Sequence, residues 1–73
     1  MSDWFKRHRV EWIAEMVEIY GFINREHIMK KFGVSEPQAS VDLREARSQQ
    51  LVEYNVTTKR YEKHPSFSFQ LRT

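Results

Sequence analysis

Hydrophobic residues recur along the first third of the chain at the spacing of an α-helix. From about Phe5 to Tyr20 the apolar positions fall on one side of a 3.6-residue wheel, and the other side is polar. The apolar side holds Phe5, Trp12, Ile13, Met16, Val17 and Tyr20, and the polar side holds Arg7, Glu11, Glu15 and Glu18. The pattern predicts one amphipathic helix, capped by Ser2 or Asp3 and ended by Gly21. Arg9 falls on the apolar side, where we expect its stem to pack and its guanidinium to stay in water.

A second, short helix is predicted within residues 23–33. Asn24 suits the N-cap position that precedes it. Lys30 and Lys31 fall in the last turn, where the helix dipole favours cations. Gly33 is placed to end the helix, because the left-handed conformation needed there favours glycine.

A third helix is predicted from about Glu36 to Ser48 or Gln49. Ser35 is its expected N-cap, Gln38 is the capping-box partner three positions on, and Pro37 stands in the first turn. The junction with the second helix is so short that the two helices must meet at a sharp angle.

The pattern changes after Gln50 to that of short strands. Residues 51–54 and 60–64 are predicted to form a β-hairpin around a loop at 55–59. Because no Asn-Gly pair marks a two-residue turn, we expect a flexible tip of three to five residues. Pro65 ends the hairpin, and the alternation over residues 67–71 suits a further strand or an interface segment.

This order of elements is that of a winged helix-turn-helix. Residues 24–46 (NREHIMKKFGVSEPQASVDLREA) resemble the helix-turn-helix of DeoR-like bacterial repressors and of the N-terminal domains of WYL-type regulators. The similarity continues through LVEY at 51–54 and KRY at 59–61, which match the wing strands, and covers most of residues 10–64. One departure is Val41, where family members commonly carry arginine.

The resemblance implies a mainly α-helical domain with a small β-hairpin, a winged helix-turn-helix of three helices plus wing. We expect this domain over residues 1–64 and a C-terminal tail over 65–73. The resemblance also implies a bacterial or phage transcription regulator that binds duplex DNA, a repressor, and the WYL-type similarity implies the N-terminal domain of a longer protein.

Helical phase separates the two faces of the third helix. With Ala39, Leu43 and Ala46 turned to the core, the outer face holds Pro37, Val41, Arg44 and Ser48, flanked on one side by Ser40 and Arg47 and on the other by Gln38 and Glu45. A solvated face without a partner is the plain alternative to a DNA-reading face.

The outer face has the chemistry of base recognition. Arg44 suits guanine O6 and N7 or a phosphate, Gln38 suits adenine, and Val41 suits a thymine methyl. Ser40 is able to bond either a base or a phosphate. For Asp42, near the core edge, a structural role as acceptor for a nearby amide or arginine is favoured over recognition of cytosine.

Charge is sorted along the chain although its sum is only +2. Residues 24–35 and 51–73 each carry an excess of two basic residues, whereas residues 13–23 hold only two glutamates. Backbone contacts are therefore expected from Arg25 and Ser35 at the helix starts, and from Thr57, Thr58, Lys59 and Arg60 at the wing tip. Residues 36–50 sum to −1, with three acidic and two basic residues, which leaves open a protein-interaction module without DNA binding.

Other classes of protein find little support. The 73 residues have no cysteine and only two glycines, which excludes thiol catalysis, the usual structural zinc sites and a glycine-rich phosphate loop. His8, His27 and His64 are scattered. We therefore expect no enzyme, cofactor, metal or evident small-molecule ligand. No apolar run is long enough for a membrane helix or signal peptide, so the cytoplasm is the expected location.

Surplus apolar residues at the two ends predict a homodimer. The core of so small a domain does not obviously need them, and exposed apolar patches usually mark interfaces. They are Trp4, Phe5, Phe67, Phe69 and Leu71.

Overall fold

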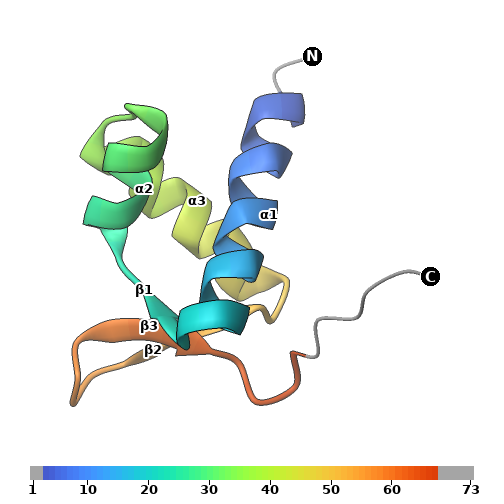
Figure 1. Cartoon of the computed structure of the whole chain (residues 1–73), viewed down its shortest axis with the longest axis vertical. Helices are drawn as coiled ribbons and strands as arrows, with labels where there is room; N and C mark the ends of the chain where they lie inside the picture. The colour runs from blue at the N-terminus through green and yellow to red at the C-terminus, as the bar shows by residue number, and fades with distance from the viewer. Residues whose placement is uncertain (1–2, 68–73) are drawn as a thin grey trace.

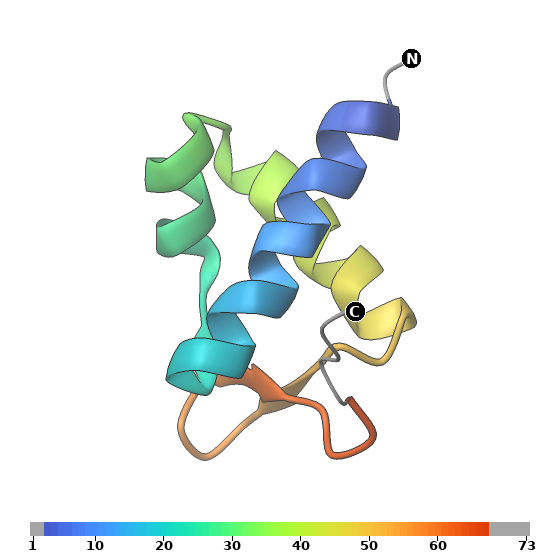
Figure 2. The same cartoon turned by 45° about the vertical axis from the view of Figure 1, so that its right-hand side comes forward.

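The computed structural model describes residues 3–67, in which three helices pack above a three-stranded antiparallel sheet (Figure 1). In chain order the elements are α1 (Asp3–Tyr20), β1 (Phe22–Ile23), α2 (Arg25–Phe32), α3 (Glu36–Ser48), β2 (Val52–Asn55) and β3 (Arg60–Lys63). The sheet order is β1-β3-β2. In both Figure 1 and Figure 2 the β2–β3 hairpin lies beneath the helices, and α3 passes behind α1. The winged helix-turn-helix architecture is confirmed.

The core lies where the three helices meet the sheet. Its fully or nearly buried members come from every helix and from β1 and β2: Val10, Ile13, Val17, Ile23, Ile28, Ala39, Leu43, Ala46 and Val52. The predicted buried face of α3 is therefore confirmed. Burial of these side chains is the main force that holds the helices together.

The predicted apolar face of α1 is wrong at both ends. Phe5 is 63% exposed and Tyr20 is 67% exposed, whereas Val10 and Ala14 are buried. A helical wheel gives the direction of a side chain but not its position along the axis. Phe5 and Tyr20 lie near the two ends of the 18-residue helix, outside the stretch from Val10 to Val17 that holds its buried residues.

Arg9 also differs from its expected position. Its Nε donates to Asp42 Oδ2 at 2.6 Å and its Nη2 donates to Asp42 Oδ1 at 3.3 Å. The side chain of Asp42 is fully buried and that of Arg9 is only 14% exposed. The guanidinium is drawn out of water because α3 places a buried carboxylate beside it, and the structural role expected of Asp42 is confirmed.

The turn between α2 and α3 follows its predicted chemistry. Gly33 adopts the left-handed conformation with φ of 67°, and its N–H donates to Met29 O at 2.8 Å. Ser35 Oγ accepts from the N–H of Gln38 at 3.3 Å. The other half of the expected capping box is missing, because the Gln38 amide bonds Asp42 at 3.1 Å.

At the start of α2, Asn24 stands in the predicted N-cap position. Its N–H donates to Nδ1 of His27 at 3.2 Å. Its own Oδ1 is buried and has no hydrogen-bond partner among residues 3–67. The ring of His27 therefore makes the reciprocal half of a capping box at the predicted N-cap residue Asn24.

The sheet contains a strand that the sequence did not predict. Phe22 and Ile23 pair with Glu62 and Tyr61 of β3, so the hairpin is joined to the chain entering α2. The hairpin itself is confirmed, with β2 beginning one residue later than expected and β3 ending at Lys63. Two residues are too few for alternation to be visible in a sequence.

The tail is described only as far as Phe67, which packs against the core. Its N–H donates to His64 O at 2.9 Å in a turn. The predicted further strand and the residues Phe69 and Leu71 lie outside the described residues.

The Arg9–Asp42 pair predicts a large effect of a nearly isosteric change. Asp42→Asn leaves a largely buried guanidinium without its counter-charge, so the free energy of unfolding should fall by about 3 kcal/mol or more. Glu45→Gln is the control, because it breaks the exposed ion pair of Glu45 with Lys6, which also joins α1 to α3. It should change the free energy of unfolding little. Urea denaturation of both variants makes the comparison. Equal losses would show that burial of the pair is immaterial.

The α2–α3 turn predicts two distinct kinds of damage. Ala39 is fully buried, so Ala39→Leu should overpack the core and cost about 1–3 kcal/mol. A Cβ at Gly33 would meet nothing within 4 Å, so Gly33→Ala should cost only the left-handed backbone, about 1–2 kcal/mol. Gly33→Asn should recover part of that loss, because asparagine tolerates this conformation. Thermal melting measures all three, and an unchanged melting temperature for Ala39→Leu would contradict the packing.

Candidate nucleic-acid interface

One face of α3 is left uncovered by the rest of the domain. Opposite the buried residues of this helix, the side chains of Pro37, Arg44, Arg47 and Ser48 are exposed, and those of Ser40 and Val41 are half-buried. The structure thus brings together on one surface most of the residues that the helical phase assigned to recognition.

The acidic residues of α3 are all paired with cations from other helices. Glu36 Oε2 lies 3.3 Å from Nη2 of Arg25, Asp42 is bonded to Arg9, and Glu45 Oε1 lies 3.6 Å from Nζ of Lys6. The Gln49 amide, followed by the charge of Lys6, lowers the pKa of Glu45 below its ordinary value. The negative charge of this segment is therefore neutralised locally.

The basic residues of α3 have no such partners. Neither Arg44 nor Arg47 forms an ion pair or side-chain hydrogen bond with any residue in the range 3–67. Two guanidinium groups therefore project from an exposed helix face, with all of their donors available to an outside ligand.

Gln38 is not on the open face. Its side chain is half-buried and its Nε2 donates to Asp42 Oδ1 at 3.1 Å. A glutamine needs both its amide nitrogen and its oxygen to read adenine bidentately. Because the nitrogen is already engaged, the structure favours an orienting role for Gln38 within the α1–α3 contact.

Arg25 and Ser35 lie at the starts of α2 and α3, as expected. The guanidinium of Arg25 crosses the turn to Glu36, and both side chains are exposed. Ser35 Oγ serves as the cap of α3. Each has donor capacity that these contacts leave unused, so a phosphate at this turn remains a prediction.

The wing tip is organised by one side chain. Asn55 Oδ1 accepts from the N–H groups of Thr57 and Thr58 at 2.9 and 3.1 Å, and Asn55 O accepts from the N–H of Lys59 at 2.7 Å. The Asn55 amide and the Thr58 hydroxyl donate to the carboxylate of Glu62 at 3.1 and 3.0 Å. These bonds lower the pKa of Glu62 below its ordinary value, and the bond from Asn55 has the largest effect. The flexible tip expected from the sequence is instead a hydrogen-bonded turn.

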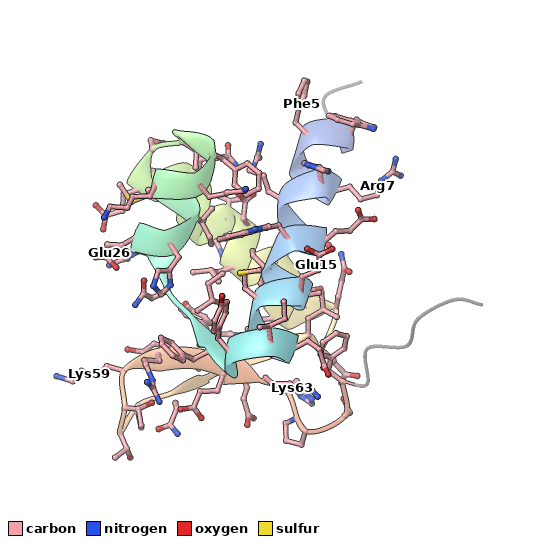
Figure 3. All side chains as sticks on the ribbon, viewed as in Figure 1. Phe5, Arg7, Glu15, Glu26, Lys59 and Lys63 are labelled. Carbon is pink, nitrogen blue, oxygen red and sulfur yellow. The ribbon has the colours of Figure 1, made fainter. Side chains whose placement is uncertain are left out.

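The two basic residues of the wing differ in availability. Lys59 is exposed at the tip, where Figure 3 shows its side chain extending away from the sheet. Arg60 is half-buried, with its guanidinium 4.1 Å from the centre of the Phe22 ring and 3.6 Å from Glu62. Arg60 is thus held against β1, whereas Lys59 is free to meet a phosphate.

Sequence reasoning missed the parts played by Asn55 and Phe22. An asparagine followed by polar residues between two strands is a known signal of a turn in which the asparagine side chain bonds the backbone. The role of Asn55 could therefore have been predicted from the sequence. The Phe22–Arg60 contact was not, because it depends on the pairing of β1 with β3.

Other kinds of site are not found in the described part of the chain. Within it, no group of three or more histidine or acidic side chains is placed to hold a metal ion. No helix among residues 3–67 combines the length and apolar character needed to cross a membrane.

Comparison with known proteins agrees with this geometry. Among curated proteins none matches the chain. The family model described as the BrxR transcriptional regulator winged helix-turn-helix domain matches residues 6–73, which is nearly the whole sequence. The three helices, the capped turn and the three-stranded wing are those of a winged-helix regulator domain. The chain therefore belongs to the BrxR transcriptional regulator winged helix-turn-helix domain family.

Proposed function

We propose that this domain binds duplex DNA sequence-specifically and acts in the cytoplasm as a repressor. The observation that supports it best is the local pairing of every acid on α3, which leaves Arg44 and Arg47 unpaired on an exposed face. In this proposal α3 enters the major groove, as the second helix of a helix-turn-helix does. The resemblance to DeoR-like repressors supports the direction of regulation.

The proposed DNA-binding residues fall into two groups, those that contact bases and those that contact the phosphate backbone. Arg44 is the principal base contact, with Val41 offering an apolar patch to a thymine methyl and Ser40 a hydroxyl to either a base or a phosphate. Arg47, Ser48 and Pro37 border this patch. On the backbone, Arg25 and Ser35 contact phosphate at the α2–α3 turn, and Thr57, Thr58 and Lys59 do so from the wing. Gln38 and Arg60 are assigned to support, since each is engaged within the fold.

Arg44→Ala and Lys59→Ala are expected to fail in different ways. A bidentate contact to guanine is worth about 1–3 kcal/mol of discrimination, so Arg44→Ala should lower the ratio of specific to scrambled binding by about tenfold or more. Lys59→Ala should weaken all sequences alike and reduce the salt slope by about one unit. Site selection from random duplex DNA, followed by titration of both variants across a salt series, provides the measurement.

Two controls keep this comparison clear. Thermal melting must show both variants folded, and Arg7→Ala removes an equal charge from the exposed side of α1. An unchanged specificity ratio for Arg44→Ala would mean that α3 is not the reader. Absence of any DNA binding by the folded wild type would favour a protein-interaction module.

We also propose that the DNA-bound form is a homodimer. Trp4 is 55% exposed and Phe5 is 63% exposed at the start of α1. Their rings meet edge to face, with their centres 4.9 Å apart. Such a patch suits an interface, and a dimer would read half-sites about 34 Å apart. Sedimentation with a palindromic site should give two protein chains per duplex, and Trp4→Ala/Phe5→Ala should reduce this to one. A monomer at tens of micromolar with or without the site would refute the dimer.

A further inference from the structure

An apolar groove opens between α1 and α2, above β1, and shares no lining residue with the surface proposed to bind DNA. Its volume is about 480 Å³, and its apolar wall includes Trp12 and Met16 of α1 and Phe22 of β1. No residue of α3, β2 or β3 lines it. Pockets of about 300–1,000 Å³ with mainly apolar and aromatic walls are typical of small-molecule sites.

The α2 side of the groove is cationic. Lys30, Lys31 and His27 complete the lining. Lysines in such a position lay their methylene stems along the apolar wall and keep their ammonium groups in water. The ammonium of Lys31 lies 5.9 Å from the centre of the Trp12 ring, directly beside that wall.

These cations are not neutralised by the fold. Neither lysine forms an ion pair with a residue in the range 3–67, in contrast to Lys6 and Lys63. Glu26, the acidic residue of α2, lies in Figure 3 on the side of this helix that faces away from α1. Because Nδ1 of His27 accepts from the N–H of Asn24, the neutral ring carries its proton on Nε2 and adds a third donor.

We propose that this groove binds a small amphipathic carboxylate. The apolar body of the ligand packs against Trp12, Met16 and Phe22. Its carboxylate lies at the α2 side, where the two ammonium groups and the His27 N–H receive it. A neutral apolar molecule would gain the first set of contacts but not the second, so the charge of the ligand decides its affinity.

Trp12 gives a direct readout of binding. The chain has two tryptophans, so Trp4→Phe leaves Trp12 as the only one. Decanoate below its micelle concentration serves as the probe, and decanol is the uncharged control with the same chain. We expect a saturable shift of Trp12 emission to shorter wavelength with decanoate. Decanol should bind about ten- to a hundredfold more weakly, the value of two partly screened charge contacts.

Single-charge variants test the head-group contact in the same Trp4→Phe background. Lys30→Ala and Lys31→Ala should each weaken decanoate by about three- to tenfold and leave decanol unchanged. Arg7→Ala is the matched control, because Figure 3 shows Arg7 on the side of α1 that faces away from α2. It removes the same charge and should leave both affinities unchanged.

Three results would overturn the proposal. The first is no saturable change at Trp12 with decanoate in protein shown by melting to be folded. The second is equal affinity for decanoate and decanol, or equal weakening by Arg7→Ala and Lys30→Ala. The third is a shift of Trp12 emission with protein concentration alone, which would show that a second copy of the chain fills the groove.

Discussion

The buried ion pair between Arg9 and Asp42 determines how α3 is turned about its own axis. A fully buried carboxylate is tolerated only where its charge is compensated, and here the compensation comes from α1 through Arg9 and from the same helix through Gln38. Asp42 must therefore face α1. Arg44 follows two residues later, about 200° further around the helix at 3.6 residues per turn, and so faces outward. The contact that secures the core thus also sets the direction of the principal proposed reader.

The pairing of charges explains how a segment with a net negative charge presents a basic surface. Each acid on α3 is satisfied by a cation that belongs to α1 or α2. The buried contact of Asp42 with Arg9 holds α3 against α1, and all three contacts remove the acids as competitors for Arg44 and Arg47. The sum of −1 over residues 36–50 is therefore a poor guide to the field that a ligand meets at this face. The sign of the electrostatic potential at this face is therefore set by which charges are paired and which are not.

Local signals predicted α3 well and long-range contacts poorly. The Ser35 cap, the Gly33 turn and the spacing of Ala39, Leu43 and Ala46 are short-range features, and all are confirmed. The four-residue spacing of Gln38 and Asp42 was also a usable signal, because such pairs bond on a helix surface. The Arg9–Asp42 and Arg60–Phe22 contacts were missed because the two partners in each are more than 30 residues apart in sequence. No periodicity reports a contact of that kind.

The wing shows how a proposed phosphate contact is prepared by residues that never touch DNA. Lys59 has φ of 59°, a left-handed conformation that costs an L-residue about 1–2 kcal/mol. The Asn55 side chain bonds the N–H groups of the two threonines before it, and Asn55 O bonds the N–H of Lys59 itself. Glu62 fixes Asn55 in turn. Because the turn is already ordered, binding a phosphate would lose little backbone entropy there, and most of the ordering would fall on the lysine side chain alone.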